Sequence, residues 1–406
     1  MRNIGTCSKL AAILVVSCVA AGSGIAAAQT WSSPQSVANG LGIAVATNGT
    51  GTSAVLFMPA SGGLQASVKT GSTWGTPVTL SSLGSFGGGT GNISVAPNGD
   101  VLATWSFRTT NTYIPNEAQA AFFSGGHWGS TITISTNVYG NVSSFGLPSI
   151  GFDGHSQATL VWEEITNPSP IACALKTITG SAASGFGAAQ TISNATTCYG
   201  WNNLAVNSGG QAVVVEGAAG ILSAAVVAVS RDLTGSWSAP VTIGASGVYR
   251  QRQPKLGLGN DGTAVVVWLT NGSVRYAVRS GGSWSTAATL PGIAGTAGGL
   301  AGVAVDGSGN SVAIFEQVSI SPGNYATCRP VGGTWQTKVQ LSSSVQVAAT
   351  PAGTFVAGGT TVSTRLAGTS NWTTHTFSGG AIVNTAPGLA IALVGPQVSI
   401  STAAVP

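Results

Sequence analysis

One unit recurs along the chain and most constrains its fold: a tight turn, an apolar run, and a second run ending at an aromatic residue. In residues 259–284 it reads GNDGTAVVVW, a polar break, and RYAVRSGGSW. An Asn/Asp/Gly turn before a β-branched run predicts a β-hairpin. Eight copies of the turn and apolar run begin at Gly51, Gly99, Ser156, Gly210, Gly262, Asn310, Gly353 and Gly388.

A second marker is an aromatic residue that starts a strand after a Gly/Ser-rich turn. It occurs at Trp31, Trp74, Trp128, Phe186, Trp237, Trp284, Trp335 and Trp372. Spacings of 37 to 58 residues between successive markers are of the size expected for a four-stranded propeller blade.

The two markers are out of phase, because Trp31 precedes every hairpin and no aromatic strand follows the hairpin at Gly388. If residues 31–38 pair as the outer strand of a last blade over 380–403, eight blades are complete and the ring closes without exposed edges. The sequence therefore predicts an all-β fold: an eight-bladed β-propeller of four-stranded antiparallel blades, forming one domain over 29–406. Seven blades is the alternative.

Residues 1–28 read as a secretory signal peptide. Arg2 and Lys9 flank a polar start, residues 10–21 are apolar, and Ala26, Ala27 and Ala28 offer a small-residue cleavage site. A secreted, periplasmic or extracellular protein is expected, or alternatively one lipid-anchored through Cys18. No later stretch approaches ~20 apolar residues, so no transmembrane segment is expected in the mature chain.

The net charge and the cysteines limit the classes of partner and the kind of compartment expected for this chain. Without Arg2 and Lys9, the 14 basic and 10 acidic residues become 12 and 10, a net charge too small and scattered for a nucleic-acid partner. An exported chain with three remaining cysteines permits one disulfide, and Cys173 with Cys198 is the closest pair. Neither a cofactor nor a metal is predicted, because the three histidines are isolated and no phosphate-binding glycine pattern occurs.

Polar and aromatic residues gather in the loops that leave the second and fourth strands of each blade, which share one face of a propeller. All five glutamates are assigned to the second strand's end or the loop after it. This face is the candidate binding face, where rings stack on sugars and charged groups fix orientation. The candidate ligand-binding residues are Glu163, Tyr199, Trp201, Glu216, Tyr249, Arg250, Arg252 and Glu316.

Glu216 and Glu316 are the sharpest candidates, since they align with Trp105, Trp162 and Trp268 at the end of the second strand. A carboxylate in a core aromatic position must be paired or functional. Pairing with Arg250 or Arg252 is one interpretation, and catalysis by Glu216 and Glu316 is another.

The GGSW and GGTW turns of the repeat, with its apolar runs, resemble secreted bacterial β-propellers grouped with sialidases and propeller lectins. The Asp-box of sialidases is absent and no arginine triad matches, so the resemblance does not imply glycosidase activity. The leading hypothesis is a non-catalytic recognition module that binds glycan or a surface protein. The alternatives are a glycoside hydrolase or lyase that uses loop-face glutamates, and a structural propeller without a ligand.

Overall fold

The computed structural model describes most of the chain after residue 29. The described ranges are 30–82, 90–108, 116–138, 147–168, 171–195, 198, 202–217, 224–246, 254–270, 272–293, 297–342, 346–359, 361–366, 369–377, 381–387, 389–394 and 398–405. Strands alone form the regular structure of these residues, and all pair antiparallel, as an all-β propeller-type fold predicts. Within the same ranges, no helix has the length and apolar character needed to cross a membrane.

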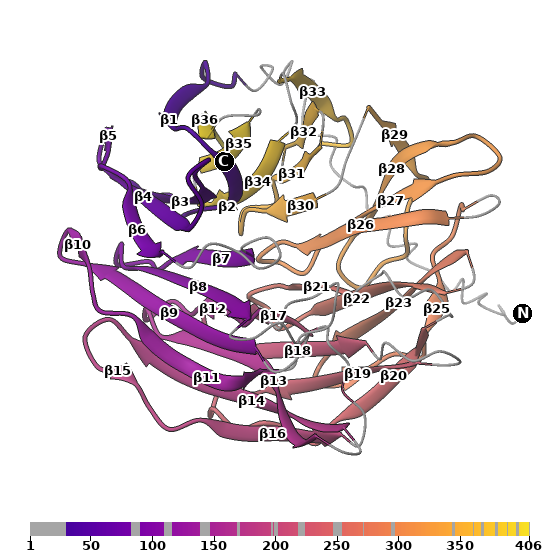
Figure 1. Ribbon diagram of the computed structural model, residues 1–406. Coiled ribbons are helices and arrows are strands. Elements are labelled where there is room, and N and C mark those ends of the chain that lie inside the picture. The colour runs from indigo at the N-terminus through magenta and orange to yellow at the C-terminus, as the bar shows by residue number, and fades with distance from the viewer. Residues whose placement is uncertain are drawn as a thin grey trace, which may run out of the picture.

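The first sheets follow the chain in order (Figure 1). One contains β2 (Leu41–Thr47), β3 (Thr52–Met58), β4 (Leu64–Thr70), β5 (Thr73–Trp74) and β6 (Val78–Ser81). The next is ten-stranded, with β7 (Thr90–Val95), β8 (Val101–Arg108), β9 (Asn116–Ser124), β10 (His127–Trp128), β11 (Ile132–Val138), β12 (Ser149–Phe152), β13 (Ala158–Pro168), β14 (Ile171–Ser181), β15 (Gly185–Phe186) and β16 (Gln190–Ala195). Its two parts, β7–β11 and β12–β16, are joined where Val138 of β11 pairs with Glu164 of β13.

Two further sheets continue around the molecule. One contains β17 (Asn202–Val206), β18 (Ala212–Gly217), β19 (Ala224–Arg231) and β20 (Val241–Ser246). Its neighbour contains β21 (Lys255–Leu258), β22 (Ala264–Thr270), β23 (Ser273–Ser280), β24 (Ser283–Trp284) and β25 (Ala288–Thr289).

Three four-stranded sheets complete the fold. They are β26 (Ala297–Val305), β27 (Ser311–Gln317), β28 (Gly323–Arg329) and β29 (Val339–Leu341); β30 (Gln346–Ala349), β31 (Phe355–Gly358), β32 (Thr361–Arg365) and β33 (Thr373–Thr376); and β34 (Ala381–Ala386), β35 (Leu389–Val394) and β36 (Val398–Ala404) with β1 (Gln35–Ala38).

The turn between the first and second strands of a sheet is built from side chains that bond their own backbone. Asp306 Oδ1 accepts hydrogen bonds from the backbone N–H groups of Ser308 and Asn310, both at 2.9 Å. Asp153 makes the same pair of contacts with His155 and Gln157. Such Asx turns fix the hairpin register, which explains the Asn/Asp/Gly signal of the repeat.

The core lies between the sheets, because the second strand of each sheet is covered on both faces. In β18, Val213 and Val215 pack with Trp268 of the following sheet, while Val214 packs with Val161 of β13. Burial on both faces accounts for valine runs with no polar alternation.

The two ends of the described chain meet in the last sheet (Figure 1). Strand β1 pairs with β36, with Gln35 opposite Ile400, and the ring of Trp31 lies edge-on to Phe377 at 5.8 Å between centroids. The first and last sheets also pack on each other through an apolar cluster that contains Phe57 and Leu393.

Candidate functional site

The second strands share one position that identifies the candidate site. In six of the hairpins formed by a first and a second strand, the turn has the same length. In each of them, the residue four positions after the first paired residue of the second strand is large and buried. The residues at this position are Phe57, Trp105, Trp162, Glu216, Trp268 and Phe315, all 2% exposed or less. Glu216 is the ionisable member of this set, so it departs from the apolar pattern that the other five residues share.

The prediction that Glu316 occupies this position is wrong. Phe315 fills it, and Glu316 is exposed one residue further along. The alignment placed Asn310 opposite Gly262, whereas the left-handed turn residue is Gly309 with φ 88°, matching Gly262 with φ 82°. A slip of one residue moves a strand's side chain to the other face.

Glu216 faces Glu163 across the interface between β18 and β13. Glu216 lies on the same face of β18 as Val214, and Glu163 on the same face of β13 as Val161, because side chains two apart in a strand share a face. Val214 and Val161 pack together in one buried cluster with Leu175. Both carboxyl groups are buried, at 2% and 3% exposed, so the pair lies at the edge of this apolar layer.

Burial dominates the chemistry of Glu216. Burial, as the larger cause, and the negative charge of Glu163 together raise the pKa of the Glu216 carboxyl from an ordinary 4.5 to about 8. A charged carboxylate loses its hydration when buried, and a like charge nearby adds repulsion. Glu216 is therefore protonated at neutral pH and is able to donate a proton.

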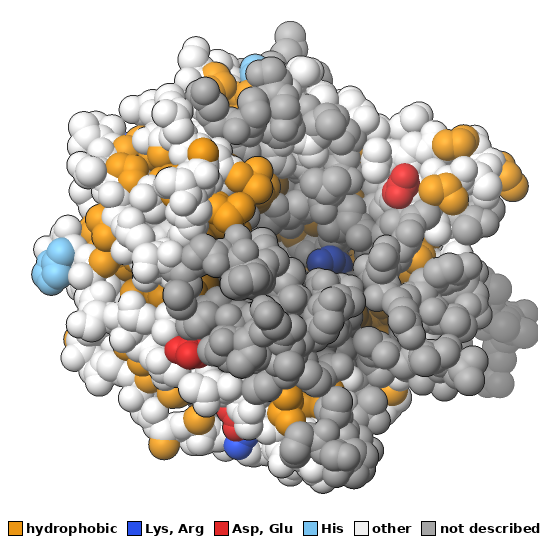
Figure 2. Space-filling model, in the orientation of Figure 1, with side chains coloured by type: hydrophobic (Ala, Val, Ile, Leu, Met, Phe, Trp, Pro, Cys, Tyr) orange, Lys and Arg blue, Asp and Glu red, His pale blue; other side chains and the backbone are white. Residues whose placement is uncertain are grey.

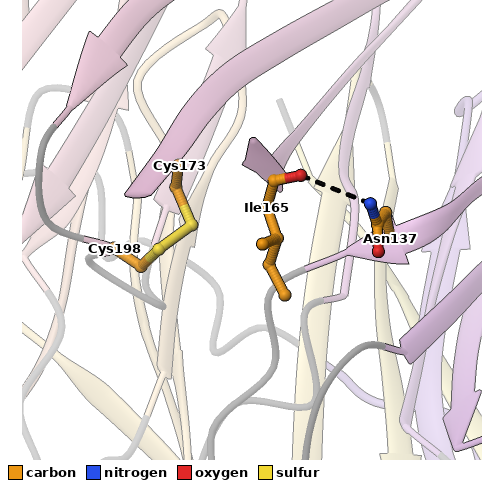
Figure 3. Close-up of a disulfide and its surroundings, with 4 residues drawn as sticks. All are labelled: Asn137, Ile165, Cys173 and Cys198. Carbon is orange, nitrogen blue, oxygen red and sulfur yellow. Dashed lines mark hydrogen bonds between the residues drawn. A yellow bond between two sulfur atoms is a disulfide. The ribbon is translucent and has the colours of Figure 1, made fainter. Parts of the chain in front are cut away.

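A disulfide borders the pair. Cys173 on β14 is bonded to Cys198, with 5.0 Å between their Cα atoms, and both pack against Ile165 (Figure 3). The backbone carbonyl of Ile165 accepts a hydrogen bond from Asn137 Nδ2 at 3.4 Å. A carboxylate oxygen of Glu163 and the two sulfurs lie within 4.8 Å of one another, but sulfurs in a disulfide are not thiolate ligands for a metal.

Glu164 points to the opposite face of β13 and has a different role. Its Oε2 accepts hydrogen bonds from Ser135 Oγ at 2.8 Å and from Trp162 Nε1 at 3.1 Å. Lys176 Nζ lies 3.9 Å from Oε1. This network ties the two parts of the ten-stranded sheet together and makes Glu164 a structural residue.

Asn202 and Ser149 are polar neighbours of the site that sequence reasoning missed. Asn202 is paired with Glu216 across β17 and β18, and Ser149 Oγ donates a hydrogen bond to Asn202 Oδ1 at 2.8 Å. Neither residue belongs to the loops on which the prediction concentrated. What marks Asn202 and Ser149 as site residues is the pairing register of the strands, which cannot be seen in a single sequence.

The structure does not place the other predicted site residues next to Glu163 and Glu216. Tyr199, Trp201, Tyr249, Arg250 and Arg252 lie outside the described residues. On the face shown in Figure 2, charged side chains are few and scattered among the described residues. Within those residues, Glu163 and Glu216 are thus the predicted candidates that meet.

No family model matches the chain, and no curated protein matches it. Among solved structures, it resembles a puromycin-hydrolysing peptidase from Mycobacterium tuberculosis at 13% identity, covering 91% of this chain and 61% of that one, with TM-score 0.50. It also resembles an ulvan lyase of polysaccharide lyase family 25 at 12% identity, covering 93% and 96%, TM-score 0.48. A third is the α-L-arabinanase of Penicillium chrysogenum, at 16% identity, 66% and 92% coverage, TM-score 0.38.

These similarities extend to the fold, which is of the propeller type, and give no specific likeness to sialidases. The lyase and the arabinanase are catalytic proteins. The hypothesis of a non-catalytic recognition module finds no support in these structures, whose names are those of enzymes, and it gives way to its alternative, a glycoside hydrolase or lyase. The physical reason for the error is that aromatic and charged loop residues suit binding and catalysis equally, so loop composition does not separate the two.

Proposed function

We propose that the protein is a glycan-degrading enzyme, a glycoside hydrolase or lyase, whose acid/base pair is Glu216 and Glu163. The observation that carries the proposal is the facing of the two buried carboxyl groups between β18 and β13. Glycoside hydrolysis usually depends on two carboxyl groups, of which one is held protonated and the other ionised by their different environments.

In the proposed hydrolysis, Glu216 donates its proton to the glycosidic oxygen as the bond to the sugar's anomeric carbon breaks. Glu163, as the carboxylate, stabilises the positive charge that develops at that carbon and receives a proton from the attacking water, or bonds to the carbon itself. The raised pKa of Glu216 supports the donor assignment. Because both carboxyl groups are buried, a bound sugar must displace the side chains that cover them.

Replacing Glu216 with Gln is expected to lower kcat by at least about a hundredfold, since proton transfer by one positioned group contributes on the order of 10²–10⁴. The measurement is reducing-end release from a panel of neutral and uronic-acid polysaccharides, with ultraviolet absorbance to detect the unsaturated product of a lyase.

Glu164→Gln is the matched control, because Glu164 is next to Glu163 in sequence but points to the other face of β13. Its kcat should stay within a few-fold of the wild type. Equal activity of Glu216→Gln and the wild type would remove Glu216 from the mechanism, and no turnover of any polysaccharide would reject the enzyme.

We further infer that the chain is an eight-bladed propeller. The ten-stranded sheet divides into two four-stranded patterns joined by the pairing of Val138 with Glu164, which gives eight patterns with the other six sheets. The pairing of β1 with β36 supports closure of the ring. Export, by way of residues 1–28, and a glycan partner complete the proposal, and the Cys173–Cys198 disulfide agrees with an oxidising compartment.

Closure is tested at Gly42 of β2, where an added Cβ would lie 2.6 Å from Leu393 Cδ2 of β35. Gly42→Ala should destabilise the protein by about 1–3 kcal/mol through overpacking between the first and last sheets. Urea denaturation of Gly42→Ala, Leu393→Ala and the double variant measures the coupling. If the two sheets pack, part of the penalty disappears in the double variant, whereas additive effects would contradict closure.

A further inference from the structure

Asn202, the cross-strand partner of Glu216, differs from the residues at the equivalent position in other sheets, as Glu216 itself does. In three other sheets, the large side chain at this position pairs with a residue that offers no side-chain hydrogen bond. The pairs are Gly42 with Phe57, Gly91 with Trp105, and Leu300 with Phe315. Here the pair is Asn202 with Glu216, so both members have become polar.

Asn202 is held in place from the neighbouring sheet. Ser149, the first residue of β12, donates its hydroxyl hydrogen to Asn202 Oδ1 at 2.8 Å and lies 3.2 Å from the backbone oxygen of Asn202. Because antiparallel partners share a face, the Asn202 amide lies on the same side of its sheet as the Glu216 carboxyl. The hydrogen bond to Ser149 directs Oδ1 toward β12.

Exposure separates the two partners. Glu216 is buried, whereas Asn202 is half-buried, so Asn202 is the member of the pair that solvent reaches. A ligand in solution can therefore contact the exposed part of Asn202. With Oδ1 occupied by Ser149, the Nδ2 group offers donors to an oxygen of that ligand.

We propose that Asn202, oriented by Ser149, is the residue that positions the substrate at Glu216, by donating a hydrogen bond to a hydroxyl oxygen of a neutral sugar. This inference rests on the proposed function and adds its substrate class. An amide matches an uncharged hydroxyl, whereas carboxylate or sulfate groups are bound in proteins chiefly by Arg and Lys. The buried negative charge of Glu163 beside the site further disfavours an anionic sugar ring.

The test uses 4-nitrophenyl glycosides of neutral hexoses and pentoses, and the matching monodeoxy glycosides that lack one hydroxyl each. Asn202→Ala should lower kcat/KM about tenfold on the parent glycoside, the size expected for one lost hydrogen bond. On the glycoside that lacks the recognised hydroxyl, wild type and Asn202→Ala should be equal. A merely structural role would lower kcat/KM on both glycosides alike, and that outcome would overturn the proposal.

Ser149→Ala should have a smaller effect of the same kind, about threefold, because it frees the amide without removing it. The double variant should be no worse than Asn202→Ala, since the two residues act as one unit. The control is Asn203→Ala, whose Nδ2 donates to the carbonyl of Pro254 at 2.7 Å, toward the other neighbouring sheet.

The outcomes separate the two proposals. Turnover by wild type that is lost in Glu216→Gln but unchanged in Asn202→Ala overturns the role of Asn202 and leaves the enzyme standing. Turnover confined to uronic-acid glycans overturns the neutral-sugar assignment. Absence of turnover on every glycoside and polysaccharide overturns the proposed function and this inference together.

Discussion

The free energy of unfolding of the wild-type protein is expected to fall by about 5 kcal/mol between pH 4.5 and pH 8 through Glu216. Burial and, to a smaller extent, the negative charge of Glu163 raise the pKa of this carboxyl from 4.5 to about 8 in the folded protein. Between these values, the folded state binds a proton that the unfolded state has released, so stability is lost as pH rises. Each unit of pKa difference corresponds to about 1.4 kcal/mol. The full contribution is present below pH 4.5.

Urea denaturation across this pH range measures the effect. In Glu216→Gln most of the decline should vanish, because the amide has no proton to lose. Glu163→Gln should make the decline shallower, since the like charge of Glu163 is the second cause of the raised pKa. Glu164→Gln should leave it nearly unchanged. A wild-type stability that is flat from pH 4.5 to pH 8 would show that Glu216 is not buried as described.

Trp268→Ala is expected to cost about 4 kcal/mol of unfolding free energy, the usual size for deleting a large buried aromatic side chain. Trp268 is 1% exposed and packs with Val213 and Val215 of the preceding sheet. Its ring lies directly over Gly244 of β20, where an added Cβ would be 2.3 Å from the ring atom Cζ2. The ring therefore fills the space between two sheets, and its removal leaves a cavity.

Trp284→Ala is the matched control, because Trp284 lies on the short outer strand β24 of the same sheet and is only partly buried. Its loss should cost clearly less than that of Trp268. Chemical denaturation at one pH compares the variants. Equal costs would contradict the expectation that the more deeply buried tryptophan contributes more to the free energy of unfolding.

The repeated elements were predictable from the sequence because local chemistry specifies them. The turn around Asp306 needs only its side chain and the backbone amides of Ser308 and Asn310. The composition of residues 259–284 is in the same way enough to predict their hairpin. The alternation of faces was harder to predict. Glu316 was misplaced because the turn before it was aligned on Asn310, although the left-handed residue is Gly309.

The site was predictable only in part. Glu216 stands out in sequence because it replaces a tryptophan, and Glu163 was among the candidates. That these two face each other depends on which sheets are neighbours and on which face each side chain lies, and both are properties of the assembled fold. Asn202 and Ser149 carry no signal of their own, since single polar residues near the start of a strand are common. Their significance comes from the register of β17 with β18 and from a hydrogen bond between sheets.

The pairing of β1 with β36 has a consequence for how the protein is made. Among the described strands, β1 is synthesised first and its partner β36 last. The last sheet therefore cannot be completed before β36 is synthesised, and its completion brings together segments separated by nearly the whole described sequence. Contacts of such long sequence separation form slowly. Completion of this sheet is thus expected to be a late and slow step of folding.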